Sequence, residues 1–219
     1  MATNEATLLT RAGRAERLEG IYAIVNDDAR ALAIANAALD AGVRIVQYRA
    51  KGGIRAEALA ALRERTHAHG ALLIVNDDWR AALAFDCDGV HLGPDDEGFA
   101  AVGPVRAALR DRLIGLSCGT VDEARRANAQ DVDYLGVGAV YPTGSKADAG
   151  APIGIDGLRA VAAASRHPVA AIGGITSATI DAVRATGVAM AAVIAAIASA
   201  PHPASAARAL VERWHADRT

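Results

Sequence analysis

Cysteine is scarce in this sequence, which excludes two ways of holding a fold together. The chain has two cysteines, Cys87 and Cys118, too few for a disulfide framework and not spaced as a CxxC metal site. We expect both to be small buried side chains in a reducing compartment.

Long apolar runs and an excess of one charge are also missing. The apolar runs are short and interrupted, so no transmembrane segment is expected. The net charge is -2 with both signs mixed throughout, which does not indicate a nucleic-acid or membrane-surface partner. Residues 1–20 lack the basic start, apolar core and cleavage site of a signal peptide. We therefore expect a cytoplasmic protein whose partners are small molecules.

No Pro-, Gly- or Ser-rich linker divides the 219 residues. Hydrophobic residues make up 52% and charged residues 22%, which is the composition of a globular chain long enough to bury a substantial core. We expect one domain over residues 21–219, preceded by a polar and helical extension over residues 1–20.

Apolar runs rich in β-forming residues alternate with stretches of helical spacing, such as residues 29–42 and 54–70. Gly42, Gly70 and Gly187 end three such stretches, as left-handed helix caps do. This alternation predicts βαβ units and a parallel sheet. Eight strand–helix pairs favour a (β/α)8 barrel over an open doubly wound sheet. The predicted strands are 20–25, 43–49, 71–75, 88–92, 112–117, 132–138, 167–173 and 188–194.

The pentapeptide IVNDD occurs twice, at residues 24–28 and 74–78. Each copy ends a predicted strand just before a predicted helix. Asn and Asp at such a corner are typical helix caps, each contributing about 1 kcal/mol. The repeat is thus interpreted as one structural corner used at two equivalent positions of the barrel.

In a (β/α)8 barrel the active site lies at the carboxyl ends of the strands. The second strand ends in QYRAKGG, and its alternation places Gln47, Arg49 and Lys51 on one face, opposite Tyr48 and Ala50. Two cations beside an amide indicate an anion site. The alternative is a solvated strand end.

Acidic corners follow the next two strands. Asp77 and Asp78 come after Asn76, while Asp95 and Asp96 lie in HLGPDDEG. Two carboxylates and substrate phosphate oxygens are a typical Mg²⁺ environment. Spacing leaves open which Asp of each pair is the ligand and which is the cap. His91, near the end of the fourth strand, is more typical of a structural histidine.

The remaining polar corners follow strands six to eight. The loop 141–154 is long, as functional loops often are, and it carries Lys146, but its order GSK is not that of a P-loop. Gly173 and Gly174 follow the seventh strand, and Ile194 and Ala195 follow the eighth and open the last helix. These loops form the recurrent phosphate site of such barrels. Together with the cations after the second strand and the two acidic corners, these loops indicate a diphosphate site with a metal and a separate monophosphate site. This suggests that the protein stabilises a diphosphate leaving group.

The residues resemble the thiamine-phosphate synthase family. The similar segments are VQYRAK, IVNDDWRAALAFDCDGVHLGPDD, IGLS, DYLGVGAVYPTGSK, PVAAIGGI and AAVIAAI, which span most of residues 21–197 in order. The resemblance implies a (β/α)8 transferase of thiamine biosynthesis that uses Mg²⁺. It would join 4-amino-2-methyl-5-(diphosphooxymethyl)pyrimidine to thiazole phosphate and release pyrophosphate by dissociative substitution.

The resemblance also implies roles for individual residues. The catalytic set would be Arg49, Lys51, Lys146 and Ser117, and the metal ligands would be Asp77 and Asp96. The substrate-binding set would be Gln47, Tyr48, Arg49, Ala50, Lys51, Asn76, Ser117, Thr143, Gly144, Ser145, Lys146, Gly174, Ile194 and Ala195.

Three positions depart from the family pattern. Cys118 and Gly119 replace the Thr-His that commonly follows Ser117, Ser145 stands where Thr is common, and Ala195 stands where Ser is usual. Losing the hydroxyl at Ala195 would weaken phosphate binding by about 1 kcal/mol. The alternatives are a thiazole tautomerase, for which no His follows the fifth strand, a non-catalytic phosphate-binding barrel, and a Cys118 nucleophile, which lacks a basic partner nearby in the sequence.

Overall fold

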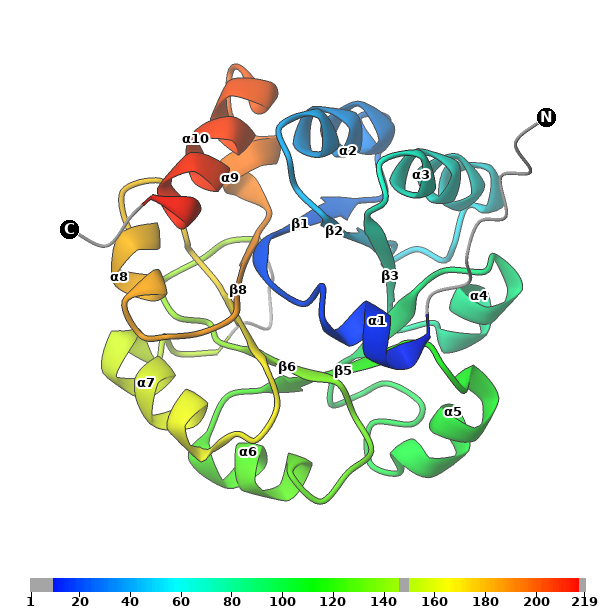
Figure 1. Ribbon diagram of the computed structural model, residues 1–219, viewed down its shortest axis with the longest axis vertical. Helices are drawn as coiled ribbons and strands as arrows, with labels where there is room; N and C mark the ends of the chain where they lie inside the picture. Colours follow the sequence, from blue (N-terminus) through cyan, green and yellow to red (C-terminus); the bar gives the residue numbers. More distant parts are fainter. Residues whose placement is uncertain (1–9, 146–149, 217–219) are drawn as a thin grey trace.

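The computed structural model describes residues 10–145 and 150–216. Its eight parallel strands pair in chain order, and β8 closes onto β1, so the predicted (β/α)8 barrel is confirmed (Figure 1). Every strand overlaps the apolar run that predicted it. The strands are β1 (Gly20–Asn26), β2 (Ile45–Arg49), β3 (Leu72–Asn76), β4 (Gly89–Leu92), β5 (Leu113–Cys118), β6 (Tyr134–Val137), β7 (Val169–Ile172) and β8 (Met190–Val193).

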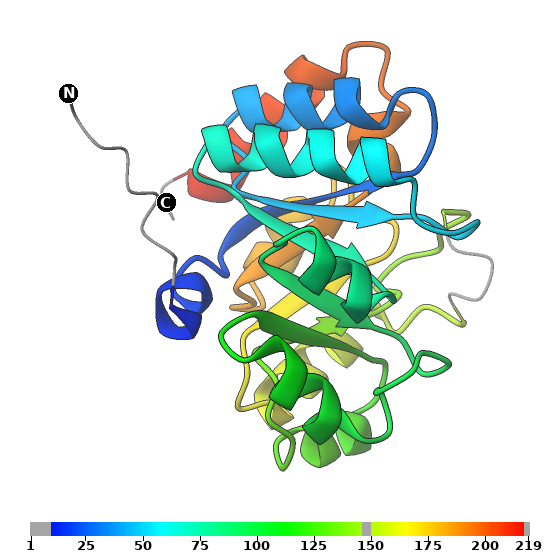
Figure 2. The ribbon, with the colours of Figure 1, turned by 90° about the vertical axis from the view of Figure 1, so that its right-hand side faces the viewer.

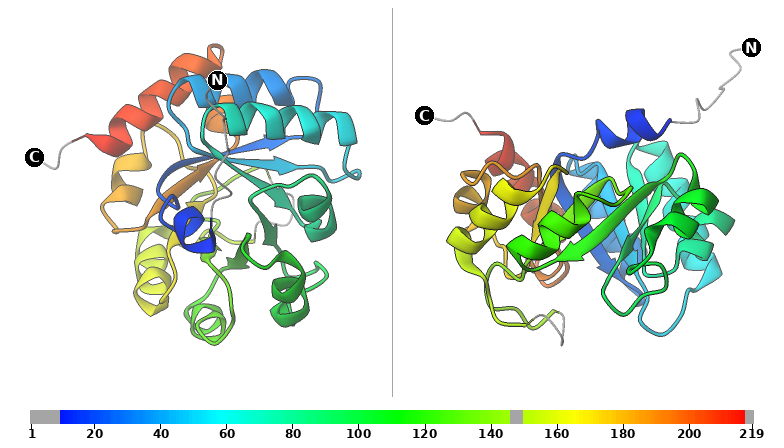
Figure 3. Two further views of the ribbon diagram at one scale, coloured as in Figure 1. Left: turned by 45° about the vertical axis from the view of Figure 1, so that its right-hand side comes forward. Right: turned by 90° about the horizontal axis from the view of Figure 1, so that it is seen from below.

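All helices but the first surround the strands, as Figure 3 shows from two sides. Gly42, Gly70 and Gly187 have φ values of 100°, 60° and 85°, which confirms the left-handed helix ends. The helices are α1 (Arg11–Ala15), α2 (Ala31–Asp40), α3 (Ala56–Ala68), α4 (Trp79–Ala84), α5 (Val102–Leu109), α6 (Val121–Ala127), α7 (Gly154–Ala164), α8 (Ile180–Arg184), α9 (Ala195–Ala198) and α10 (Pro203–His215). Among the described residues, none of these helices is long and apolar enough to cross a membrane.

One prediction about the end of the chain is wrong. Ile194 and Ala195 do not open the last helix, because they begin the four-residue helix α9. The last helix, α10, begins separately at Pro203, where proline suits the first turn because its missing N–H needs no partner there.

Apolar side chains pack in two places because strand residues alternate between the two faces of the barrel wall. An inner cluster fills the barrel with residues such as Ile45, Leu72 and Met190. A larger outer cluster lies between the strands and the helices and includes Val46 and Leu73. The rigid wall between these clusters fixes the side chains at the strand ends.

Helix α1 lies at the end of the barrel where the strands begin (Figure 2). Arg14 of α1 donates to Asp88 at 3.0 Å, and Arg11 donates to Asp133 at 2.6 Å. Asp88 also accepts a hydrogen bond from the Leu73 N–H, so this buried carboxylate joins α1 to the start of a strand. Figure 2 places α1 opposite the loops that follow the strands.

The two IVNDD copies differ at their helix ends. Asp78 caps α4 by accepting a hydrogen bond from the Ala81 N–H at 2.8 Å, which confirms the predicted cap in the second copy. The prediction is wrong for the first copy, because Arg30 holds the N-cap position of α2 and makes no side-chain cap bond. Asp28 lies farther from α2 than Asp78 lies from α4, and its side chain accepts from the Arg30 N–H instead.

Candidate active site

A cavity of about 690 Å³ opens at the carboxyl ends of the strands. It gathers most of the residues that the sequence singled out, from segments far apart in the chain. Those lining it are Gln47, Arg49, Ala50, Lys51, Asn76, Asp77, Asp96, Ser117, Thr143, Ser145, Gly174, Ile194 and Ala195.

Among the described residues, two of the predicted site residues do not line the cavity. Tyr48 is fully buried in the outer cluster, on the opposite face of β2 from Gln47, because neighbouring residues of a strand point to opposite sides. Gly144 lies between the two lining hydroxyl residues Thr143 and Ser145 without lining the cavity itself. Lys146 lies outside the described residues.

Arg49 ends β2 at the cavity wall, and it is held from β1. Its Nη1 donates a 3.1 Å hydrogen bond to Oδ1 of Asn26, which faces it in the β1–β2 register. Its Nη2 is buried and has no hydrogen-bond partner among the described residues. An unsatisfied buried guanidinium N–H costs free energy, so this nitrogen favours an anionic ligand.

The acidic corner after β3 separates its two carboxylates. Asp77 has a φ of 69°, a left-handed conformation that Asp tolerates better than most residues. Its N–H donates to the carbonyl of His91 at 2.9 Å, which ties the corner to β4. Asp77 lines the cavity, while Asp78 is exposed and caps α4. The structure therefore assigns the cap to Asp78.

The acidic corner after β4 contributes a second carboxylate. One oxygen of Asp96 accepts a short hydrogen bond from the N–H of Gly93, which orients the side chain. Asp95 and Asp96 both line the cavity that Asp77 also lines. No cluster of three or more His, Cys, Asp or Glu side chains suited to a metal occurs among the described residues. Mg²⁺ needs only one or two protein carboxylates beside phosphate oxygens and water, so this donor set fits it.

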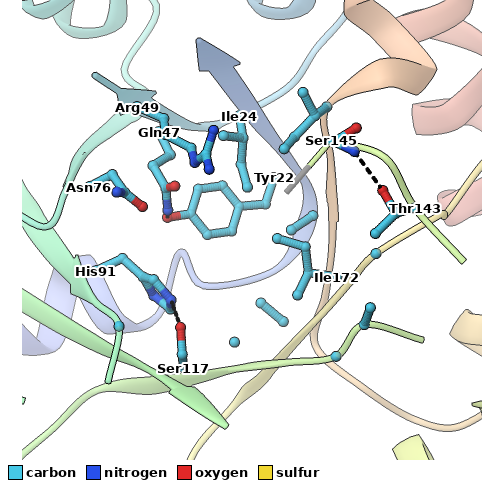
Figure 4. Close-up of a pocket in the computed structure, with 18 of the residues that line it drawn as sticks. Tyr22, Ile24, Gln47, Arg49, Asn76, His91, Ser117, Thr143, Ser145 and Ile172 are labelled. Carbon is cyan, nitrogen blue, oxygen red and sulfur yellow. Dashed lines mark hydrogen bonds between the residues drawn. The ribbon is translucent and has the colours of Figure 1, made fainter. Parts of the chain in front are cut away.

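Glycines and hydroxyls form the opposite side of the cavity. Gly174 has a φ of 64°, and a Cβ there would lie 2.6 Å from the carbonyl oxygen of Pro142, so a larger residue does not fit without a shift. Thr143 and Ser145 lie in the loop after β6, where Thr143 Oγ1 accepts from the Ser145 N–H at 3.2 Å (Figure 4). Ala195 begins α9 at the rim and brings no hydroxyl.

A hydrogen-bonded chain of five side chains crosses the inside of the barrel below this rim. Gln47 Nε2 donates to the Tyr22 hydroxyl at 2.8 Å, and the Tyr22 and Tyr134 hydroxyls are 2.9 Å apart. His91 Nδ1 lies 3.2 Å from the Tyr134 hydroxyl. His91 Nε2 lies 3.1 Å from Ser117 Oγ (Figure 4). Burial raises the pKa of the Tyr22 and Tyr134 hydroxyls, so both keep their protons.

The sequence analysis missed Tyr22 and Tyr134, and it treated His91 as structural. The two tyrosines belong to strands whose neighbouring residues are apolar, so the pattern indicated buried core. The two tyrosines could still have indicated a polar network inside the barrel, because a buried tyrosine hydroxyl usually has a hydrogen-bond partner. Two glycines make room for the chain: a Cβ at Gly115 would meet the Tyr134 ring at 2.2 Å, and one at Gly136 would meet His91 at 2.7 Å.

Cys118 reaches the cavity wall as a protonated thiol. Burial raises its pKa to about 11, and its Sγ donates to the carbonyl of Thr120 at 3.4 Å. A thiol in this state is a poor nucleophile at neutral pH. The structure thus gives no support to covalent catalysis by Cys118.

Comparison with known proteins assigns the family. A model described as thiamine monophosphate synthase matches residues 21–197. The chain belongs to the thiamine monophosphate synthase family. This confirms the resemblance drawn from the sequence, the enzyme class expected from it, a transferase, and the link to thiamine biosynthesis.

Individual members of the family agree with this assignment. A protein of Geobacillus kaustophilus named thiamine-phosphate synthase is 44% identical over 93% of this chain and 95% of its own length. One of the same name from Archaeoglobus fulgidus is 46% identical over 82% of this chain and 84% of its own. The solved thiamine phosphate pyrophosphorylase of Pyrococcus furiosus superposes with a TM-score of 0.82 at 33% identity, covering 92% of this chain and 97% of that one.

Proposed function

We propose that this chain condenses 4-amino-2-methyl-5-(diphosphooxymethyl)pyrimidine with thiazole phosphate, giving thiamine phosphate and pyrophosphate. The observation that carries this proposal is that one cavity collects two separate sets of groups suited to binding anions. Arg49, Lys51 and the aspartates follow β2 to β4, and the glycines and hydroxyls follow β6 to β8, farther around the closed barrel. Two anionic substrates could meet in such a cavity, with Gln47 and Ser117 between their phosphates.

The diphosphate is assigned to the side of β2. The buried Nη2 of Arg49 lacks a partner among the described residues, and a phosphate oxygen would supply one. Asn76 and Lys51 line the same cavity. Lys146, which lies outside the described residues, is proposed to contact the diphosphate as well. Asp77 and Asp96 would hold Mg²⁺, which when bound supplies positive charge to the diphosphate oxygens.

The thiazole phosphate is assigned to the loops after β6, β7 and β8. Gly174, Ile194 and Ala195 would offer backbone N–H groups, and Thr143 and Ser145 would offer hydroxyls. Backbone N–H groups at strand and helix ends are common phosphate ligands in such barrels. Among the described residues, those lining this side carry fewer charges than those on the diphosphate side, which suits a monophosphate.

The reaction proposed for this arrangement is a dissociative substitution. The bond between the methylene carbon and the diphosphate oxygen breaks, and both electrons leave with pyrophosphate. The electron-rich aminopyrimidine stabilises the methylene cation, and the thiazole nitrogen donates its lone pair to form the new C–N bond. Arg49 and Lys51 would stabilise the leaving group, and the cavity walls would hold the two substrates in line.

The test is a product assay with both substrates. Purified protein mixed with the pyrimidine diphosphate and thiazole phosphate in the presence of Mg²⁺ should release pyrophosphate and thiamine phosphate in equal amounts. Omitting Mg²⁺ should suppress both products. If the protein releases neither product with Mg²⁺ present, the proposed activity is wrong. Conversion of a thiazole tautomer without condensation would instead support the tautomerase alternative.

The cytoplasmic location stays a prediction.

A further inference from the structure

The hydrogen-bonded chain inside the barrel has a direction, and that direction is set at one end. The carboxamide nitrogen of Gln47 is a donor only, so the Tyr22 hydroxyl must accept from it. Tyr22 is 2% exposed, and the partner left for its own proton in the chain is the Tyr134 hydroxyl. Tyr134 is fully buried, and the acceptor left for its own hydroxyl hydrogen in the chain is His91.

The direction continues through the imidazole. A hydrogen bond donated by the Tyr134 hydroxyl to Nδ1 of His91 requires that this nitrogen be unprotonated, and a neutral ring then carries its hydrogen on Nε2. Nε2 in turn donates to Ser117 Oγ at 3.1 Å. Ser117 Oγ accepts this bond and keeps its own O–H hydrogen, which is left for a ligand in the cavity.

We propose that Tyr22, Tyr134 and His91 are positioning residues that fix the hydrogen-bonding polarity of the pyrimidine site. The chain holds the Gln47 nitrogen, so its Oε1 is presented to the ligand as an acceptor. At the other end it leaves Ser117 as a donor. An aminopyrimidine matches this pair, because its exocyclic amine donates and its ring nitrogens accept.

This inference rests on the proposed function for the identity of the ligand, but not for the direction of the chain. The reversed chain would have Tyr22 donating to a flipped Gln47 and Ser117 donating to His91. Its pair of ends would suit a ring that offers an acceptor in place of the amine. The two directions therefore differ in one atom that can be observed directly, the nitrogen of His91 that carries the hydrogen.

The first experiment reads the His91 tautomer in the full chain. The protein is labelled with ¹⁵N-histidine, and the His91 signals are assigned as those missing from His91→Gln among the six histidines. We expect Nδ1 to show the shift of an unprotonated nitrogen and Nε2 to carry the hydrogen. A hydrogen on Nδ1 overturns the proposal. This reading needs no substrate, so it stands or fails separately from the proposed activity.

The second experiment measures the selectivity of the site for a 4-amino over a 4-oxo pyrimidine. Inhibition constants are measured for unreactive analogues of the pyrimidine diphosphate that carry either a 4-amino or a 4-oxo group. Because these analogues do not ionise, the chemical role of the amine in the reaction does not affect the comparison. The wild type should prefer the amino form by roughly tenfold or more, because a mismatched buried acceptor is left unpaired. Tyr22→Phe removes the hydroxyl that holds the Gln47 nitrogen, and the preference should fall several-fold as the amide becomes free to turn.

Controls separate polarity from a general disturbance of the site. Tyr141→Phe removes a phenol from the loop after β6 that does not line the cavity, and it should leave the preference unchanged. His91→Gln keeps a donor near the position of Nε2 and should retain more of the preference than His91→Leu. Thermal unfolding checks that each variant is folded. An unchanged amino preference in folded Tyr22→Phe overturns the proposal.

Discussion

Asn26 and Arg49 face each other across β1 and β2, and the Asn26 side-chain oxygen accepts a 3.1 Å hydrogen bond from Arg49 Nη1. Asn26 belongs to the first IVNDD copy and does not itself line the cavity. The other terminal nitrogen of Arg49, Nη2, is buried and has no hydrogen-bond partner among residues 10–145 and 150–216. The first copy thus contributes to the site through the guanidinium that it holds.

Asn26→Ala should weaken binding of the pyrimidine diphosphate. Arg49 would lose one hydrogen bond that orients it, so the KM for this substrate should rise by about fivefold to tenfold while the fold is kept. Steady-state kinetics with thiazole phosphate saturating measures the change. Asn36→Ala is the matched control, because Asn36 accepts a similar 3.1 Å bond from Arg65 at the surface. An equal KM in both variants would contradict the role given to Asn26.

Substitution of Asp77 should lower turnover, whereas substitution of Asp78 should lower the stability of the fold. Asp77→Asn keeps a residue that tolerates the left-handed backbone but removes the charge, so turnover at limiting Mg²⁺ should fall strongly with little loss of stability. Asp78→Ala removes the cap of α4 and should lower the free energy of unfolding by about 1 kcal/mol while turnover persists. Metal-dependent kinetics and urea unfolding of both variants give the comparison. Near-normal turnover of Asp77→Asn at limiting Mg²⁺ would refute the metal assignment.

Ala195→Ser should tighten binding of thiazole phosphate. The new hydroxyl at the start of α9 would add one hydrogen bond to phosphate, worth about 1 kcal/mol, so the KM for thiazole phosphate should fall about fivefold. The KM for the pyrimidine diphosphate should not change. Ala204→Ser, on the exposed first turn of α10, is the control and should change neither constant. An effect confined to the pyrimidine substrate would show that the phosphate side is misassigned.

Arg14→Ala should destabilise the barrel, although Arg14 takes no part in the proposed reaction. The substitution leaves the buried Asp88 carboxylate without its 3.0 Å guanidinium partner, which typically costs about 3–5 kcal/mol. Denaturant unfolding measures the loss. Arg17→Ala, on an exposed arginine that donates to the Gly70 carbonyl, should cost well under about 1 kcal/mol. Similar stabilities for the two variants would mean that α1 does not anchor the start of the strands through Arg14.

The sequence by itself determined the barrel and the places where polar residues gather. Apolar runs separated by helical stretches predicted every strand, because a parallel strand must be buried on both faces and a helix on one. Alternation along QYRAK placed Gln47 and Arg49 on one face and Tyr48 on the other, as the structure has them. Such features depend on residues close together in the chain, so local patterns report them.

Only the tertiary structure decided which side chains meet. Tyr22 and Tyr134 are far apart in the sequence, yet barrel closure brings their hydroxyls to 2.9 Å and joins Gln47 to Ser117 through them. The two identical IVNDD segments likewise differ in the structure. Asp78 caps α4 but Asp28 does not cap α2, because α2 begins farther from the end of its strand than α4 does. A hydrogen bond depends on the positions of two atoms in space, and for distant residues those positions exist only once the barrel has closed.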